Sequence, residues 1–234
     1  MNFIPIQVAA GSSDPPWMFF AAFGGFLLLF AAIFFFVWWS EKKRAEAFSF
    51  LALKYGFEFR RKADAGLINS LSPFALFNKG RGKKAYNQLN MKKDNNTWTI
   101  FDYKYTVGSG KNSSTYNQSV AYIKIPDLKL PCFSLTPESF FHKIGDMFGY
   151  SDIDFNDHPV FSDKYFLKGP KEDEIRDLFS SEILTYFEKH LLKWNVEGLG
   201  DKMVMHQSSK RIKPVELSDF VRQADEIISV FVKK

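Results

Sequence analysis

Acidic and amide side chains at alternate positions are the most chemically suggestive residues of the chain. Asp152, Asp154 and Asn156 place oxygen ligands at the spacing that opens a calcium-binding loop, and Asp163 stands at the twelfth position of such a loop. Asp157 occupies the sixth position, where the loop needs glycine. Apolar residues alternate with the acids, so a strand with one solvent-facing side explains the same pattern. We favour the strand over the metal site.

The same stretch offers groups for acid–base catalysis. Carboxylates and histidine are side chains that exchange protons in enzymes, and Asp152, Asp154 and His158 are close together in the sequence. They define an alternative function, in which the chain is a membrane-tethered enzyme. The histidines are too widely spaced in the sequence for a metal-ligand motif. The sequence implies no cofactor and assigns no catalytic residue.

Two further motifs have simpler interpretations. Gly108-Ser109-Gly110-Lys111 resembles the second half of a phosphate-binding loop, but Tyr105 stands where the first glycine belongs. A glycine-rich hairpin turn is the better interpretation. The single cysteine, Cys132, excludes a disulfide framework. It lies in an apolar run, which favours core packing over nucleophilic catalysis.

A long apolar segment near the N-terminus is expected to anchor the chain, and with it the candidate functional residues, at a membrane. Residues 17–39 contain no charged side chain and carry Trp residues at both ends. As a helix this segment is about 35 Å long, which is enough to cross a hydrocarbon core of about 30 Å. A cleaved signal peptide is the competing interpretation, but no positive charge precedes the segment. We expect a transmembrane helix over residues 17–39.

The charges that flank this segment predict its orientation. Lys42, Lys43 and Arg44 follow the span, and no Lys or Arg precedes it. By the positive-inside rule, residues 1–16 form an extracytoplasmic tail and the large C-terminal part lies in the cytoplasm. A single cysteine agrees with a reducing compartment.

The basic residues are concentrated next to the span. Residues 41–93 hold 13 Lys and Arg against 4 Asp and Glu, whereas residues 94–234 hold 18 against 21. Basic segments beside a membrane are attracted to anionic lipid headgroups. We expect a lipid-facing surface made by Lys42, Lys43, Arg44, Arg60, Arg61 and Lys62. The sequence shows no nucleic-acid-binding signature, so we expect no nucleic-acid partner.

The periodicity of the remaining chain predicts an α+β domain. Residues 40–56 have a helical stripe that ends at Gly56, and residues 57–84 read as irregular. Strands follow, with the clearest alternation over Thr97–Val107. Helices are predicted from Pro170 and from Pro214. We expect one N-terminal transmembrane helix, a juxtamembrane helix at 40–56, and a domain at 57–234 with an antiparallel sheet and segregated helices. The other expected strands include Leu89 and Met91, or cover Thr115–Ile125, Cys132–Leu135 and two segments within Trp194–His206.

Several short stretches together resemble a family of uncharacterised bacterial membrane-anchored proteins with a cytoplasmic α+β domain. The stretches are Lys84-Ala85-Tyr86-Asn87, Phe101-Asp102-Tyr103-Lys104-Tyr105, Gly108-Ser109-Gly110-Lys111, Gln118-Ser119-Val120, Phe133-Ser134-Leu135-Thr136-Pro137-Glu138, Asp152-Ile153-Asp154-Phe155, His158-Pro159-Val160-Phe161-Ser162 and Val196-Glu197-Gly198. The resemblance covers nearly the whole chain. It implies a bacterial source and the topology given above, and it assigns no activity to any residue.

These observations favour a single-pass protein of the bacterial inner membrane. Its cytoplasmic domain is expected to act as a binding or membrane-surface interaction module rather than as an enzyme. The expected partners are the lipid bilayer, anionic lipid headgroups and another membrane protein. The alternative remains a tethered enzyme that uses Asp152, Asp154 and His158.

Overall fold

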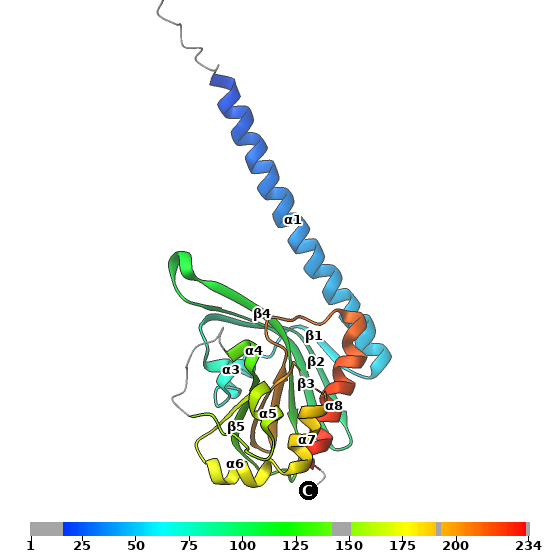
Figure 1. Ribbon diagram of the computed structural model, residues 1–234. Helices are drawn as coiled ribbons and strands as arrows, with labels where there is room; N and C mark the ends of the chain where they lie inside the picture. The colour runs from blue at the N-terminus through cyan, green and yellow to red at the C-terminus, as the bar shows by residue number, and fades with distance from the viewer. Residues whose placement is uncertain (1–15, 142–150, 191–192, 233–234) are drawn as a thin grey trace, which may run out of the picture. The chain divides into compact units, whose positions relative to one another are not determined.

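The computed structural model describes residues 16–141, 151–190 and 193–232 (Figure 1). The chain divides into two units, Met1–Arg44 and Ala45–Lys234. The described part of the first unit is helical and belongs to helix α1 (Pro16–Tyr55), which continues into the second unit. Within the described residues this is the one helix long and apolar enough to cross a membrane. A signal sequence near the N-terminus meets the same criteria of length and composition.

The second unit begins inside helix α1, at Ala45. Ala45, Phe48 and Ala52 are buried on one side of the helix, because they pack into the core of this unit. Gly56 then ends the helix with φ of +74°, a left-handed conformation that glycine adopts without a steric penalty. The N–H of Phe57 donates to the carbonyl of Ala52 at 2.8 Å, as at many glycine-terminated helices.

The second unit contains an eight-stranded antiparallel sheet, which confirms the predicted α+β class. The strand order is β1-β2-β3-β4-β8-β7-β5-β6. In sequence the strands are β1 (Glu58–Lys62), β2 (Arg81–Lys93), β3 (Asn96–Val107), β4 (Ser114–Lys124), β5 (Leu130–Pro137), β6 (Tyr165–Lys168), β7 (Asn195–Gly200) and β8 (Lys202–His206). Strands β2, β3 and β4 form a meander, and Asp94 and Asn95 make the first turn with positive φ angles.

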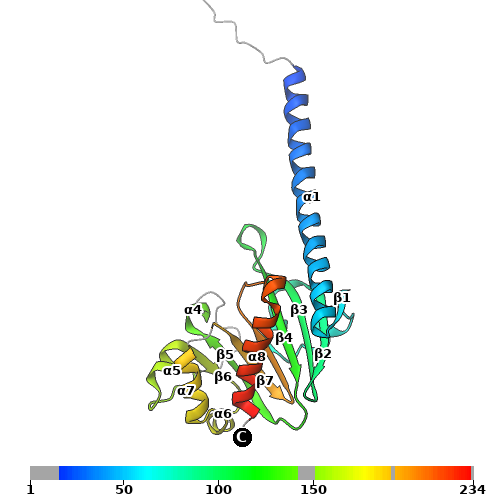
Figure 2. The same cartoon turned by 90° about the vertical axis from the view of Figure 1, so that its right-hand side faces the viewer.

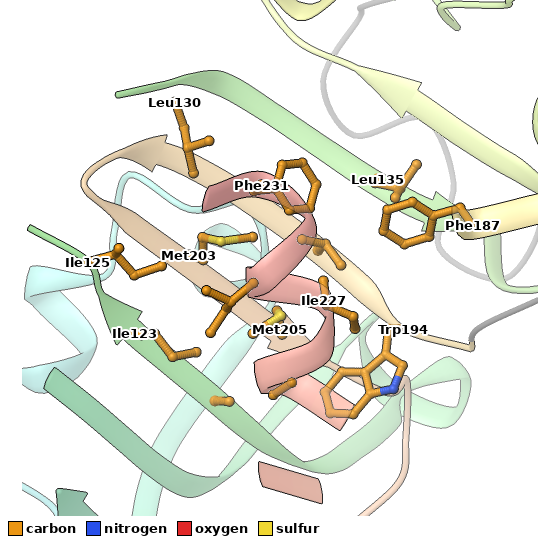
Figure 3. Close-up of a cluster of buried hydrophobic side chains, with 14 of the residues drawn as sticks. Ile123, Ile125, Leu130, Leu135, Phe187, Trp194, Met203, Met205, Ile227 and Phe231 are labelled. Carbon is orange, nitrogen blue, oxygen red and sulfur yellow. The ribbon is translucent and has the colours of Figure 1, made fainter. Parts of the chain in front are cut away.

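Strand β3 is buried on both faces of the sheet. Trp98 and Ile100 belong to a core that also contains residues of α6 (Glu172–Leu178), α7 (Ser181–His190) and α8 (Leu217–Val232). Figure 3 shows part of this core, with Ile227 and Phe231 of α8 above Met203 and Met205 of β8. Phe101, Tyr103 and Tyr105 belong to a second core on the other face. There they meet two short helices, α2 (Leu67–Ser70) and α3 (Ala75–Asn78).

Strand β2 changes phase in its middle. Tyr86 lies opposite Asp102, but Leu89 lies opposite Ile100, so the strand holds one extra residue between them. Asn87 sits in this bulge with φ of +52°. Because one residue is inserted, the side of the sheet that Lys84 and Tyr86 face before the bulge is faced after it by Leu89 and Met91. A second register shift lies between Arg81 and Lys84.

The structure departs from the expected elements in three places. Residues 57–84 are not irregular, because they hold β1, α2, α3 and the start of β2. The helix expected from Pro170 is two helices, α6 and α7, separated at Phe179 and Ser180; the side chain of Phe179 is buried. Residues 152–155 form no strand, although the N–H of Ile153 donates to the carbonyl of Leu167 in β6 at 2.8 Å. The remaining helices are α4 (Glu138–Phe141), α5 (Pro159–Lys164) and the 3₁₀ segments η1 (Gly110–Asn112) and η2 (Pro214–Glu216).

The packing of helix α1 onto the sheet domain predicts a contrast between two phenylalanines. Phe48 is 2% exposed and Phe50 is 70% exposed. Phe48→Ala should lower the unfolding free energy by about 3–5 kcal/mol, because it empties a core site. Phe50→Ala should change it by less than about 0.5 kcal/mol. Urea unfolding of the purified chain in detergent measures both; similar losses for the two variants would contradict this packing.

Candidate functional site

The predicted lipid-facing residues fall into two groups. Lys42 and Lys43 are exposed on α1, and the amine of Lys42 lies 5.6 Å from the centre of the Trp38 ring. An ammonium over an indole is a favourable contact, and it joins the basic flank to the tryptophans at the end of the apolar segment. Arg44 follows them on the same helix.

The second group lies on edge strand β1. Arg60, Arg61 and Lys62 are all exposed there, and Arg60 binds Glu58 at 2.8 Å. Asp64 also binds Arg60, so the charge of this arginine is largely balanced. Basic side chains on an edge strand discourage pairing with another sheet. Protection of the sheet edge explains why Arg60, Arg61 and Lys62 are basic, with no need for a bound ligand. Arg61 and Lys62 are the members of this group best placed to contact an anionic partner as well.

The residues of the enzymatic alternative line one groove. Asp152, Asp154 and His158 surround a space of about 710 Å³ together with Arg176 and Ser181. The Oδ1 atom of Asp152 accepts hydrogen bonds from the backbone N–H groups of Ile153 and Leu167, both at 2.9 Å. The carboxylate is therefore fixed at the point where residues 152–153 run beside β6.

Two further contacts hold the walls of this groove. The Nδ1 atom of His158 lies 3.3 Å from a carboxylate oxygen of Glu188 in α7, and both side chains are mostly buried. Arg176 of α6 donates to the carbonyl oxygen of Asp154 at 2.8 Å and lies over the Phe155 ring. The groove thus combines carboxylates, an imidazole and a guanidinium, which are groups used in proton transfer and in binding of charged ligands.

The ligands of the alternative metal site are divided between the segment 152–156 and helix α5. Asp154 and Asn156 are exposed, and Asp163 lies on helix α5 outside the residues that line the groove. In the described ranges, no three His, Cys, Asp or Glu side chains come together as metal ligands would. The Oδ1 atom of Asp152 is engaged with two backbone N–H groups.

The groove alters the ionisation of Asp152. Burial raises the pKa of this carboxyl to about 6, and the nearby Asp154 charge acts in the same direction. The two backbone hydrogen bonds oppose the shift, because they stabilise the carboxylate. A carboxyl that titrates close to neutral pH is suited to proton transfer.

A buried carboxylate lies on the other face of the sheet, in a stretch that carries the family resemblance. Glu197 of β7 accepts hydrogen bonds from the N–H groups of Ala75 (2.5 Å) and Leu76 (3.1 Å), so it holds the start of α3 on the sheet. Burial raises the pKa of Glu197, and the positive charge of Lys79 opposes this shift. Burial also lowers the pKa of His206 to about 3, so this imidazole is neutral at neutral pH.

Cys132 does not pack in the core as expected. Its residue is exposed at the rim of a cavity of about 90 Å³, which Phe133, Lys168 and Glu197 also line. Desolvation raises the pKa of the thiol, which keeps it protonated and poorly nucleophilic. The side chain that enters the core here is its neighbour Phe133.

A second buried polar network fixes the loop between β8 and α8. Asp102 accepts hydrogen bonds from Ser119 (2.7 Å) and Asn87 (3.0 Å) and binds Arg211 at 3.3 Å. The guanidinium of Arg211 lies over the ring of Tyr86. Sequence reasoning missed this network, because Asp102 and Arg211 are 109 residues apart. The one local indication in the sequence was Asp102, an acidic residue between the aromatic residues Phe101 and Tyr103 of β3.

The comparisons identify the fold. Neither protein-family models nor a search of curated proteins gives a match to this chain. Among solved structures, the crystal structure of the mycobacterial trehalose monomycolate transport factor A is similar, with a TM-score of 0.53 and 9% sequence identity. The similarity covers 82% of this chain and 96% of the mycobacterial chain. At this identity the likeness shows a shared fold. The apolar helix and this bacterial neighbour fit a membrane-associated protein.

The raised pKa of Asp152 predicts how its replacement changes stability with pH. The folded state holds the Asp152 proton more tightly than the unfolded chain, whose Asp pKa is about 3.9. Ionisation therefore costs stability progressively as the pH rises from about 4 through about 6. Asp152→Asn keeps an acceptor oxygen and removes the charge. It should raise the unfolding free energy at neutral pH by about 1 kcal/mol, a value reduced for partial solvent exposure.

Urea titrations below about pH 4 and at neutral pH measure this difference, which should disappear in acid because Asp152 is then protonated in both states. Asp154→Asn is the matched control. Asp154 is exposed, and its replacement should change stability by less than about 0.5 kcal/mol at either pH. A loss of stability at neutral pH in Asp152→Asn would contradict the assignment.

Proposed function

We propose that this chain is a single-pass protein of the bacterial inner membrane whose cytoplasmic domain is a binding module at the membrane surface. The observation that carries the proposal is the partition of charge around the apolar helix. No Lys or Arg precedes the helix, and Lys42, Lys43 and Arg44 follow it directly. Such an asymmetry keeps the basic flank on the cytoplasmic side. The tail at 1–16 is then extracytoplasmic, and the apolar helix is retained as an anchor.

The partner proposed for the basic residues is the anionic surface of the inner leaflet. Exposed Lys42, Lys43, Arg61 and Lys62 supply positive charge in the part of the chain that follows the anchor. Each basic residue near an anionic membrane contributes about 1 kcal/mol of attraction. We propose no nucleic-acid partner, because tethering to the membrane favours the lipid as the anion.

Another membrane protein is the second proposed partner. Phe50 and Leu53 are 70% and 83% exposed, and their spacing of three places them on one side of helix α1. The similar mycobacterial protein is described as a transport factor. By analogy, we propose that this domain assists a membrane-embedded transport protein rather than carrying out transport itself.

Cysteine labelling tests the topology. In a Cys132→Ser background, Ser12→Cys in the tail should react with a membrane-impermeant maleimide in intact spheroplasts. Ser181→Cys on α7 should react after lysis alone. Replacement of Lys42, Lys43 and Arg44 by Glu should produce a fraction of inverted molecules, because it removes the positive flank.

Labelling of Ser181→Cys in intact spheroplasts would contradict the cytoplasmic placement. Loss of an N-terminal epitope tag from the mature protein would show a cleaved signal peptide instead of an anchor. In the same membranes, a photo-crosslinking residue at position 53 should capture a membrane protein, and one at exposed position 182 serves as its control.

The groove supports a second candidate function, a membrane-tethered enzyme. Asp152 would exchange a proton, because its pKa of about 6 lies close to neutral pH. Asp154 and His158 line the same groove and would bind or orient the substrate. This candidate rests on the convergence of three residues that the sequence had already grouped.

A substrate panel tests this candidate. The purified full chain would be assayed against phosphate esters, glycosides and acyl esters. An enzymatic groove predicts turnover that falls by about 100-fold or more in Asp152→Asn. Asp163→Asn, outside the groove, should leave turnover unchanged. Wild-type protein without turnover on the panel, or equal turnover in Asp152→Asn, would count against the enzyme.

A further inference from the structure

One end of the β2–β3–β4 meander carries positive charge without compensating carboxylates. Residues 65–93 and 103–126 contain no Asp or Glu. Strands β2, β3 and β4 therefore contain a single carboxylate, Asp102, which is buried and binds Arg211. We call the exposed cations at the hairpin end of these strands the distal cationic surface. Its members are Arg81, Lys84, Lys104 and Lys111.

The register of β2 and β3 places two of these lysines directly against each other. Lys84 is the partner of Lys104 in the antiparallel ladder, so their side chains leave the same face of the sheet. Both are exposed, and within the described residues neither forms an ion pair with a carboxylate. Like charges in directly opposite positions destabilise a sheet. An anion bound between or above the two amines would offset their repulsion and so stabilise the sheet at this place.

The neighbours of this pair are polar rather than apolar. Lys104 lies opposite Asn117 of β4, and the hydroxyl of Tyr86 donates to the Asn117 side chain at 2.8 Å. The hydroxyl groups of Thr106 and Thr115 are 3.0 Å apart one step nearer the hairpin tip. The face thus offers hydroxyl and amide groups beside ammonium groups, a combination that suits the phosphate and glycerol oxygens of a lipid headgroup.

The hairpin tip completes the surface. Arg81 donates to the carbonyl oxygen of Gly108, which ties the first residue of β2 to the turn after β3. Gly108 has φ of +83°, and a side chain there would strike the Asn112 backbone. The tip is therefore a closed turn that presents Lys111 at the end of the meander.

The position of this end within the second unit selects the source of the anion. In both Figure 1 and Figure 2, the β3–β4 hairpin tip lies at the end of the unit where helix α1 enters. The unit begins at Ala45, six residues after Trp39, and six residues span at most about 20 Å. If residues 17–39 cross the bilayer, Ala45, where the unit begins, stays within about 20 Å of the membrane surface.

We infer that the distal cationic surface binds anionic phospholipid headgroups, and that the β3–β4 hairpin is a second contact of the domain with the membrane. The inference rests on the proposed topology and adds a binding site that is separate from Lys42–Arg44 and Arg60–Lys62. Two contacts, the anchor and the hairpin end, would hold the domain in one orientation over the inner leaflet. The groove that contains Asp152 uses other elements, α6 and α7, and remains available to a ligand.

Energy transfer in nanodiscs tests the inference. The full chain carries a donor dye on Ser109→Cys at the hairpin tip, in a Cys132→Ser background, and the lipid carries a headgroup acceptor. Transfer should be greater in discs of equal phosphatidylcholine and phosphatidylglycerol than in phosphatidylcholine alone. High salt should abolish the gain, because it screens exposed charges. Transfer from a donor on Ser181→Cys in α7 shows whether the whole domain, rather than the hairpin alone, changes its distance from the lipid headgroups.

Charge variants make the test specific. Lys84→Gln with Lys104→Gln should reduce transfer from the tip in the anionic discs to the level of the neutral discs. This double variant removes a repulsion, so it should unfold at the same urea concentration as the wild type or a higher one. The matched control is Lys92→Gln with Lys124→Gln, which removes two exposed lysines at the opposite end of the same strands and should retain the gain.

Equal transfer in neutral and anionic discs would overturn the inference, as would an unchanged gain in the Lys84/Lys104 variant. An equal loss in the Lys92/Lys124 control would also overturn it, because the effect would then reflect net charge alone. The topology is measured separately by labelling at position 181. If labelling places the domain in the cytoplasm but transfer from the hairpin tip does not depend on anionic lipid, the proposed topology stands and this lipid-binding site is excluded.

Discussion

Strand β3 has to bury both of its faces, and the arrangement of the second unit depends on this requirement. An antiparallel sheet in a small domain commonly leaves one face in water. Here Trp98 and Ile100 need a cover on one side, and Phe101, Tyr103 and Tyr105 need one on the other. Helices α6, α7 and α8 cover the first side, while α2 and α3 cover the second. Glu197 secures the second cover, because it binds the backbone at the start of α3.

The sequence predicted the elements whose patterns are long and regular. Strand β3 and helix α8 show clear periods of two and of 3.6 residues, so both were placed correctly. Strands β1 and β6 were missed, because they have only five and four residues, and β1 is almost wholly exposed at a sheet edge. The break between α6 and α7 was missed because the buried side chain of Phe179 continues the apolar pattern through the interruption.

The candidate sites show the same division between local and distant information. Asp152, Asp154 and His158 could be grouped from the sequence, because they lie within seven residues of one another and the chain between them limits their distance. Glu188, which contacts His158, lies 30 residues away and carried no signal. The pairing of Lys84 with Lys104 likewise depends on strand register, which the bulge in β2 alters and which composition does not reveal.

Charge is separated within the second unit in a way that matches its two candidate surfaces. The β2–β4 meander is basic, whereas the groove beside α6 and α7 is lined by Asp152, Asp154 and Asp157. An anionic bilayer attracts the first surface and repels the second. In the proposed topology, such a charge distribution would orient the domain over the membrane with its acidic groove turned away from the bilayer.

The bulge at Asn87 is the place where strand β2 can change in length. Tyr86 lies opposite Asp102 and Leu89 lies opposite Ile100, so two residues of β2 stand against Phe101 alone. Deletion of one of these two residues would remove the bulge and leave both pairings in place. Deletion of Ala85 would instead move Lys84 to the other face of the sheet. Related chains that keep this sheet are therefore expected to differ by one residue at the bulge rather than beside it, a signature that sequence comparison can read without a structure.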